Sequence, residues 1–283
     1  EVVAKIKENY ETEMGKVRNR LSLTLGIIYF HRRTPLRAAL EAGRQMLKIP
    51  TEQKVWKVQR IDHNAIYFNN GSKWGVPITL GDGNLDYYYP YFFDKTPAQD
   101  HPLDQRPNRF ESYRPTPNGN ERCWLVHVSE LKPGDEVWVI PSQFDFEFLD
   151  TSARRFEICY GNNGRRRGFH QNRPYLLEDL DVLKQLWKLL AGENGLTTTQ
   201  INALTGLIEA KREMWRYPTN DAQKDKVFEQ LVKDALARAE WPNGWINIPA
   251  ESRTLLEKAA INGVLTDVLE LYMELMKEKP KRT

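Results

Sequence analysis

The chain has 283 residues, of which 40% are hydrophobic and 28% charged, a composition typical of a water-soluble globular protein with about two domains. Its net charge of +3 is too small to establish a nucleic-acid partner, and no apolar run approaches the roughly 18–20 residues of a membrane span. Two cysteines exclude a four-cysteine zinc site and a disulfide framework, and they are typical of thiols in a reducing cytoplasm.

Residues 1–50 predict a helix, a strand and a second helix. Apolar residues at helical spacing indicate a helix over residues 2–18, and residues 21–30 have the alternating and then continuously apolar pattern of a strand. Thr34 as N-cap and Pro35 at the first helical position begin the second helix. A single strand has no ladder partner, so its neighbours must come from later in the chain or from sequence outside it. Because there is also no initiator Met, we expect a fragment with an incomplete domain.

Residues 51–172 predict a β-rich region. Short runs of β-branched and aromatic residues alternate there with Gly, Pro and Asn. These runs cover residues 55–60, 65–68, 74–80, 124–128, 136–140, 144–149 and 155–160. The Pro-rich stretch 90–120 is expected to be a surface loop whose aromatic opening, residues 86–93, packs against another surface.

Residues 173–283 predict a C-terminal bundle of four or five helices. Apolar residues recur there at helical spacing, and Thr197 with Gln200 forms a predicted capping box. The chain as a whole is therefore expected to be α+β, with divisions near residues 50 and 172.

Most catalytic signatures are absent from the sequence, including a nucleophile elbow, a phosphate-binding glycine-rich loop and a His-Glu-x-x-His motif. Asp145 and Glu147 form the best carboxylate pair, because strand alternation places both on one face. Such a pair is typical of a Mg²⁺ site, but the solvated face of a half-buried strand has the same pattern. No catalytic residue and no metal ligand is assigned within the chain.

Residues 151–175 are strongly basic, with six arginines, one acid and a net charge of +5. The predicted RNA-binding residues are Arg154, Arg155, Arg165, Arg166, Arg167 and Arg173. Glycines around 161–168 and nearby aromatic residues favour contact with a single-stranded nucleic-acid backbone. A solvated loop, or a patch that docks an acidic partner subunit, has the same composition.

Three segments resemble the large subunit of type III CRISPR effector complexes. Residues 21–48, with Leu25-Gly26-Ile27-Ile28-Tyr29-Phe30-His31 followed by Thr34-Pro35-Leu36-Arg37-Ala38-Ala39-Leu40, are similar to the last core strand and following helix of its palm domain. Residues 134–158 and 173–180 resemble one branch of these subunits. The helical end is similar to their C-terminal domain.

The resemblance implies a ferredoxin-like palm of which this chain carries an incomplete remnant. In the family, a Gly-Gly-Asp-Asp hairpin binds Mg²⁺ or Mn²⁺ and makes cyclic oligoadenylates from ATP once target RNA is bound. That hairpin would precede Glu1, so this chain would hold no complete active site and no cofactor of its own. Family members carry a lysine near the end of this helix, placed to meet nucleotide phosphate. Counted from Pro35, that place falls near Thr51, with Lys48 and Lys54 on either side, and Lys48 is the predicted nucleotide-binding residue.

The implied partners are the N-terminal remainder of the large subunit, small helical subunits, crRNA and target RNA. A second hypothesis is a non-catalytic assembly or RNA-binding subunit of a ribonucleoprotein, which needs only the basic segment and apolar surface. No membrane partner is expected.

Overall fold

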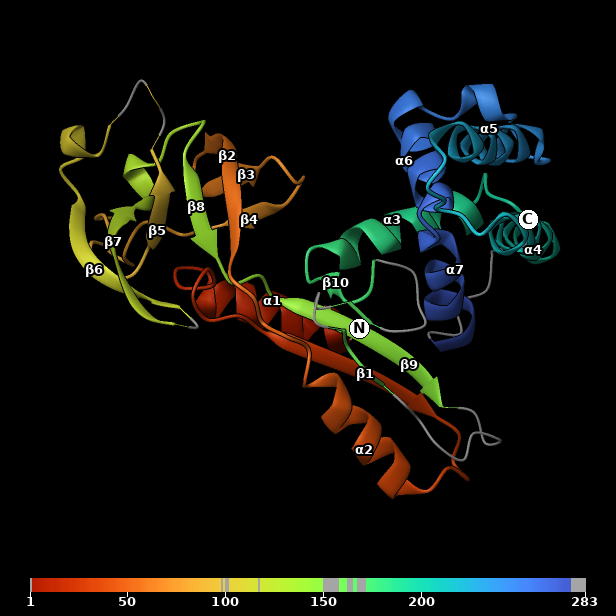
Figure 1. Ribbon diagram of the computed structural model, residues 1–283, viewed down its shortest axis with the longest axis horizontal. Coiled ribbons are helices and arrows are strands. Elements are labelled where there is room, and N and C mark those ends of the chain that lie inside the picture. Colours follow the sequence, from red (N-terminus) through yellow and green to blue (C-terminus); the bar gives the residue numbers. More distant parts are fainter. Residues whose placement is uncertain are drawn as a thin grey trace. The chain divides into compact units, whose positions relative to one another are not determined.

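The structure, a computed structural model, describes residues 2–97, 99, 102–116, 118–149, 158–161, 165–166 and 172–275. Its helices and strands confirm the α+β class (Figure 1). The chain forms two compact units, each built from separate stretches of sequence. Unit 1 comprises Glu1–Leu25, Leu47–Phe144 and Leu176–Glu178, and unit 2 comprises Gly26–Met46, Asp145–Tyr175 and Asp179–Thr283. The expected domains were continuous stretches of chain divided near residues 50 and 172, whereas each of these units combines several separate stretches.

A seven-stranded sheet, in which all neighbouring strands are antiparallel, forms the body of unit 1 (Figure 1). Its order is β4-β3-β2-β8-β5-β7-β6. The strands are β2 (Lys54–Asp62), β3 (Ala65–Phe68), β4 (Lys73–Gly75), β5 (Tyr91–Thr96), β6 (Arg109–Thr116), β7 (Gly119–His127) and β8 (Glu136–Val139). The core on one face contains Trp56, Phe68 and Trp74, whose ring centroids lie between 4.9 and 5.3 Å apart.

The predicted surface loop over residues 90–120 is wrong in part, because it contains β5 and β6. Phe92 on β5 is 1% exposed and belongs to the core. Pro115 lies in β6, which is the edge strand of the sheet, where a missing backbone N–H is tolerated. Pro115 therefore lies in an edge strand rather than in a loop. The aromatic residues of segment 86–93, expected to pack against another surface, differ in exposure: Tyr91 is buried, whereas Tyr88 is 79% exposed.

The segment after α1 (Val2–Met14) is fixed in unit 1 by a buried charge. Arg18 is 2% exposed, and its guanidinium lies 4.6 Å from the centroid of the Trp74 ring. The Glu178 carboxylate accepts hydrogen bonds from Arg18 and, at 2.8 Å, from the Trp74 Nε1. This ion pair holds the segment after α1 against the residues that follow β10 (Tyr175–Leu176).

A second sheet has the order β1-β9-β10, with β1 at Thr24–Phe30 and β9 at Gln143–Leu149. The Leu23 carbonyl accepts from the Gln143 N–H at 2.9 Å, and the Tyr29 ring stacks on Phe148 at 5.6 Å. These pairings keep a nearly constant register, so β1 and β9 run parallel and side by side (Figure 1). The neighbours of β1 were expected either later in the chain or outside it, and β9 is a neighbour from later in the chain. Among the described strands, β1 has β9 as its one neighbour.

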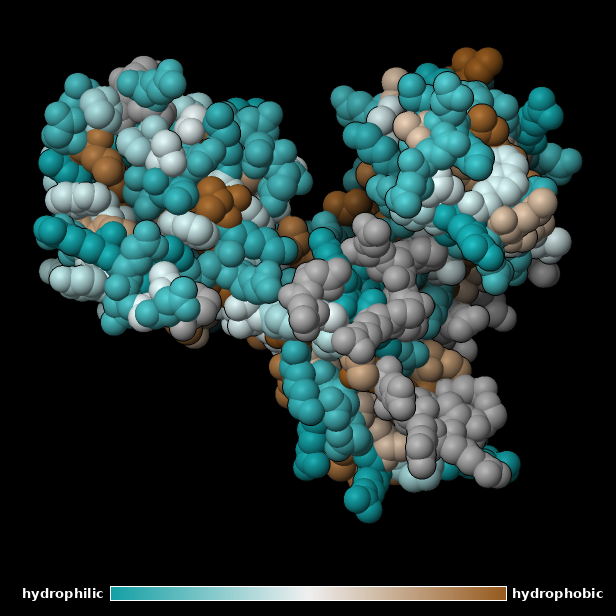
Figure 2. Space-filling view, viewed as in Figure 1, coloured by the Kyte–Doolittle hydropathy of each residue, from teal (hydrophilic) through white to brown (hydrophobic). Residues whose placement is uncertain are grey.

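The helix α2 (Leu36–Met46) uses two different faces. Ala39, Ala42 and Met46 are buried in a small core of unit 2. Leu36 and Leu40, one turn apart, remain 64% and 54% exposed. They belong to the isolated apolar patches on a largely hydrophilic surface, several of which are visible in Figure 2. The apolar residues of α2 are therefore only partly buried.

The predicted helical bundle lies in unit 2. Its helices are α3 (Asp179–Ala191), α4 (Thr198–Trp215), α5 (Ala222–Arg238), α6 (Ala250–Ile261) and α7 (Val264–Leu269), followed by a π-helical turn at Glu270–Leu275. The capping box of Thr197 and Gln200 is confirmed at the start of α4. Gly263, with a φ of 80°, divides the last predicted helix into α6 and α7. In the described ranges, no helix combines the length and apolarity needed to cross a membrane.

A buried acid on β5 predicts a pH dependence of stability. Asp94 is 8% exposed, and its Oδ1 accepts no hydrogen bond within the described residues. Burial, followed by the negative charge of Asp135, raises the pKa of Asp94 to about 7. An Asp in the unfolded chain titrates near ~4, so the folded protein binds the extra proton between these values. The free energy of unfolding therefore falls as pH rises through this window, by at most about 4 kcal/mol.

We expect Asp94→Asn to remove this part of the pH dependence and to stabilise the protein at pH 8. The measurement is urea unfolding at pH 5 and pH 8. The matched control is Asp62→Asn, because the Asp62 side chain is 46% exposed. In this variant the free energy of unfolding should change between pH 5 and pH 8 as it does in the wild type. An equal change in the free energy of unfolding between pH 5 and pH 8 in the wild type and in Asp94→Asn would contradict the prediction.

Candidate functional site

The predicted RNA-binding arginines do not share one environment. Three lie outside the described residues: Arg154, Arg155 and Arg167. Arg165 is exposed and donates from its Nη1 to the Asn172 carbonyl at 3.3 Å. Arg166 and Arg173 are buried, with exposures of 4% and 0%. The structure therefore brings Arg166 and Arg173 together in the interior of unit 2 and leaves Arg165 at its surface.

Arg166 faces the predicted carboxylate pair on β9. Its Nη1 donates to the Phe146 carbonyl at 3.0 Å and lies 3.3 Å from the Asp145 Oδ2, while its Nη2 donates to the Glu147 carboxylate. The backbone of Arg166 forms a β-bridge with Tyr160, whose hydroxyl donates to the Asp145 Oδ2 at 2.9 Å. The Arg166 guanidinium therefore binds the two carboxylates of β9 and is not available to solvent.

Arg173 connects β9 with the C-terminal helices of unit 2. Its Nη1 donates to the Phe146 carbonyl at 2.9 Å, and its guanidinium lies 3.8 Å from the centroid of that ring. Its Nε donates to the Asp267 Oδ1 at 3.0 Å and its Nη2 to the Glu270 Oε2 at 2.6 Å. Asp267 lies in α7 and Glu270 begins the π-helical turn after it. We call Arg166, Arg173, Asp145, Glu147, Asp267 and Glu270 the buried arginine cluster.

The charges of the cluster stabilise one another. Burial lowers the pKa of Arg173, but the carboxylates of Asp267, Glu270 and Asp145 outweigh it and raise the pKa above its usual value. Burial raises the pKa of the Tyr160 hydroxyl, and the neighbouring Asp145 raises it further. Tyr160 therefore stays a hydrogen-bond donor at neutral pH. The cluster is suited to holding segments together, because its charges are already paired.

The two interpretations of Asp145 and Glu147 can now be compared with their contacts. The solvated-face interpretation is wrong for Asp145, which is 0% exposed. The Mg²⁺ interpretation is disfavoured by the arginines, because a divalent cation would meet guanidinium groups at both carboxylates. Within the described residues, no group of three or more His, Cys, Asp or Glu side chains is placed to hold a metal ion.

Lys48, the predicted nucleotide-binding residue, is exposed in the turn that follows α2. The phosphate contact itself stays a prediction.

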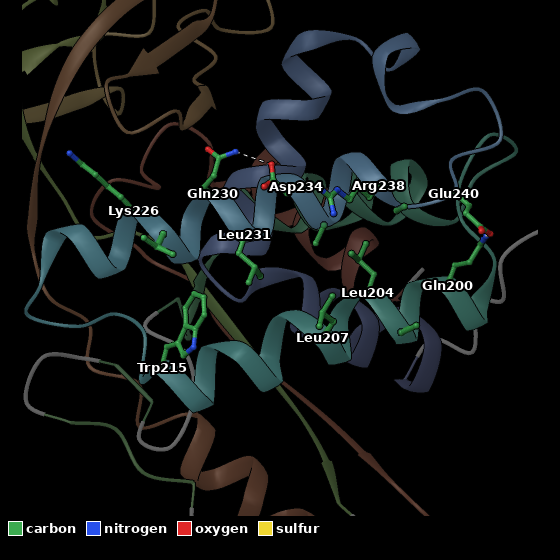
Figure 3. Close-up of a pocket in the computed structure, with 14 residues that line it drawn as sticks. Gln200, Leu204, Leu207, Trp215, Lys226, Gln230, Leu231, Asp234, Arg238 and Glu240 are labelled. Atoms are coloured by element: carbon green, nitrogen blue, oxygen red, sulfur yellow. Dashed lines mark hydrogen bonds between the residues drawn. The ribbon is translucent and has the colours of Figure 1, made fainter.

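A groove of about 850 Å³ runs between α4 and α5 in unit 2 (Figure 3). Side chains of both helices point toward each other along its apolar floor: Leu204, Leu207 and Leu231. Trp215 stands at one end, and at the other Gln200 donates to the Glu240 carboxylate at 2.9 Å. Leu207 is 48% exposed, so the apolar floor is open to solvent.

The rim of this groove carries both signs of charge, with Lys226 and Arg238 against Asp234. An apolar floor with a charged rim is typical of surfaces that bind the apolar face of an amphipathic helix. The arrangement can therefore dock a helical partner.

No family model, no curated protein and no solved structure matches this chain. The contacts described above are therefore the basis for every functional conclusion that follows.

Sequence reasoning missed two acids of the cluster, Asp267 and Glu270, and the hydroxyls of Tyr160 and Tyr175 that donate to its carboxylates. Asp267 carries one detectable signal, because it falls between Val264 and Val268 in an apolar helical stripe. A carboxylate at such a position predicts a buried partner of opposite charge. Nothing in the sequence identifies Arg173 as that partner.

The cluster predicts a large loss of stability on removal of one partner. Arg173→Ala leaves the carboxylates of Asp267 and Glu270 without their counter-ion, so we expect about 3–5 kcal/mol of destabilisation. The control Arg44→Ala removes an exposed arginine of α2 and should cost less than about 0.5 kcal/mol. Urea unfolding without RNA measures the stability of both variants. Equal unfolding midpoints for Arg173→Ala and Arg44→Ala would contradict the structural role of Arg173.

Proposed function

We propose that this chain is the C-terminal part of the large subunit of a type III CRISPR effector complex, a cytoplasmic ribonucleoprotein of antiviral defence. It completes the palm of an RNA-activated nucleotidyl cyclase that makes cyclic oligoadenylates from ATP with Mg²⁺ or Mn²⁺. The metal-binding acids belong to the N-terminal remainder of the large subunit. Lys48 contacts nucleotide phosphate in this proposal.

The observation that carries the proposal is the half-buried β1–α2 segment. Tyr29 and Phe30 at the end of β1 are each 39% exposed, and the leucines of α2 form a second apolar face. A strand with one described neighbour and a helix with two apolar faces are what a palm remnant would show. The open faces would be covered by the remainder of the palm.

The other two surfaces fit the remaining partners. The groove between α4 and α5 suits a small helical subunit. Arg165 belongs to the basic segment proposed to contact crRNA and target RNA, and the cluster ties the described parts of that segment to β9. The arginines proposed for RNA contact are therefore Arg154, Arg155, Arg165 and Arg167, whereas Arg166 and Arg173 position the segment.

A second candidate function is a non-catalytic assembly or RNA-binding subunit of a ribonucleoprotein. The pairing of Asp145 and Glu147 with Arg166 favours it, since the best carboxylate pair of the chain is occupied structurally. The two functions differ in whether the assembled complex consumes ATP.

Purification of the full complex through a tag on this chain in its native host tests the assignment. We expect short repeat-derived RNAs to co-purify, and complementary target RNA with Mn²⁺ to trigger conversion of ATP to cyclic oligoadenylates. Leu36→Asp with Leu40→Asp should lower the yield of complex at least tenfold, because it buries two charges in an apolar interface. Arg37→Asp with Arg44→Asp adds the same groups at exposed polar positions of α2 and is the control.

A complex without short RNAs would exclude the CRISPR assignment. A complex with these RNAs and no ATP consumption would favour the non-catalytic function instead. If the aspartates in α2 leave assembly unchanged, the exposed leucines are not the palm interface.

The basic segment predicts a defined change in salt dependence. Each single-strand phosphate contact contributes about 0.7 to the slope of log K against log salt concentration, so Arg165→Gln with Arg167→Gln should lower the slope by about 1.4. The thermal midpoint should stay unchanged, because the buried Arg166 is left in place. The measurement is RNA binding at several salt concentrations, with Arg37→Gln and Arg44→Gln as the control. An unchanged slope would favour docking of an acidic protein.

A further inference from the structure

The strand β6 forms one edge of the seven-stranded sheet, and among the described strands β7 is its one neighbour (Figure 1). The strand at the opposite edge, β4, has only three residues. In contrast, β6 has eight residues and pairs with β7 without a shift of register from Arg109 to Thr116. A long and regular edge strand presents backbone groups with which another strand can pair.

The pairing with β7 shows which residues of β6 face the free edge. The His127 N–H donates to the Asn108 carbonyl at 3.0 Å, so these two residues form a hydrogen-bonded pair. Such pairs alternate along an antiparallel ladder, so Phe110 also directs its backbone N–H and C=O to β7. Arg109 and Glu111 therefore direct theirs to the free edge.

The side chains along this edge are charged on one face and aromatic on the other. The Arg109 guanidinium donates to two backbone carbonyls and lies 5.4 Å from the centroid of the Trp124 ring, but within the described residues it forms no ion pair. Glu111 follows on the same face, is 40% exposed and pairs with the exposed Arg122. On the opposite face, Phe110 is 45% exposed. Arg109 thus lacks a carboxylate that a neighbouring strand could supply.

Opposite charges two residues apart make this edge complementary to itself. In an antiparallel pair of β6 strands with its two-fold axis at Phe110, Arg109 of each copy lies opposite Glu111 of the other. An axis at Arg109 or at Glu111 would place like charges opposite each other, which is destabilising. An axis at Ser112 would place Arg109 opposite Pro115, which has no backbone N–H. The charges therefore select the axis at Phe110.

We propose that β6 pairs in this register with β6 of a second copy of this chain, which joins the two seven-stranded sheets edge to edge. Arg109 and Glu111 exchange backbone hydrogen bonds across the interface, and each Arg109 gains a carboxylate. The two Phe110 side chains meet in a non-hydrogen-bonded pair, where directly opposite side chains are closest. The contact is short, so the dimer dissociates on dilution. This inference goes beyond the proposed function and does not depend on it.

Sedimentation equilibrium of the full chain at several concentrations tests the pairing. Arg109→Glu and Glu111→Arg each place like charges opposite one another at two symmetric positions, and each should weaken dimerisation about tenfold. An equimolar mixture of these two variants has opposite charges at both positions and should form heterodimers as tightly as the wild type dimerises. The control is Arg60→Glu, which reverses an exposed arginine of β2 in the same sheet and should dimerise as the wild type does.

An intermolecular disulfide tests the register. Cys123→Ser and Cys159→Ser first remove the native thiols. In that background Phe110→Cys should cross-link two copies on mild oxidation, because directly opposite Cβ atoms lie about 4.5–5.5 Å apart. Ser112→Cys lies on the same face but away from the two-fold axis, and it should not cross-link.

Three results would overturn the proposal. The first is a wild type that stays monomeric at every concentration reached. The second is a dimer that persists in both single variants, because association would then use another surface, such as the free edge of β1. The third is an equimolar mixture that stays monomeric although circular dichroism shows both variants to be folded, because Arg109 and Glu111 would then not face each other.

Discussion

Unit 2 depends on the guanidinium of Arg173. It lies against the Phe146 ring of β9 and reaches the carboxylates of Asp267 and Glu270 in the C-terminal segment. A buried arginine is tolerated only when its charge and its donors are matched, because the cost of removing it from water is several kcal/mol. The same contacts therefore fix a strand, the arginine-rich segment and the end of the helical bundle at once.

This arrangement changes what an arginine-rich segment means. Six arginines within 151–175 suggested a continuous surface for phosphates. The structure instead divides the described ones by burial: Arg165 faces solvent, and Arg166 and Arg173 bind carboxylates of the same unit. Charge counted along a sequence does not distinguish these roles, since the acids that neutralise Arg173 lie about ninety residues away.

Much of the fold was predictable from local patterns. Runs of β-branched and aromatic residues predicted β3 and β9, and the capping box predicted the start of α4, because these signals come from neighbouring residues. The strands β5 and β6 were missed because Pro90 and Pro115 read as loop residues. Pro90 only precedes β5, and Pro115 lies in the edge strand β6, where a missing N–H is tolerated. A contact between distant segments, such as Glu178 with Trp74, leaves no local pattern.

The candidate sites were less predictable for the same reason. The pairing of Asp145 with Glu147 on one strand was visible, but the arginine that satisfies both was assigned to RNA. A hollow in unit 1 is lined by Asn19, Trp138 and Tyr113 from three separate segments, so it emerges only from the folded arrangement. Burial of side chains, rather than their identity, decided each of these cases.

The position of β1 in its sheet has a consequence for handling the protein. In the described sheets its outer edge has no neighbouring strand, so the backbone N–H and C=O groups of that edge can form hydrogen bonds with another strand. Produced alone, the chain would be prone to self-association and aggregation along this edge, particularly with Tyr29 and Phe30 partly exposed beside it. A polypeptide that pairs along this edge would suppress such misassembly on co-expression, so recovery of monodisperse protein would be an indicator of a suitable companion.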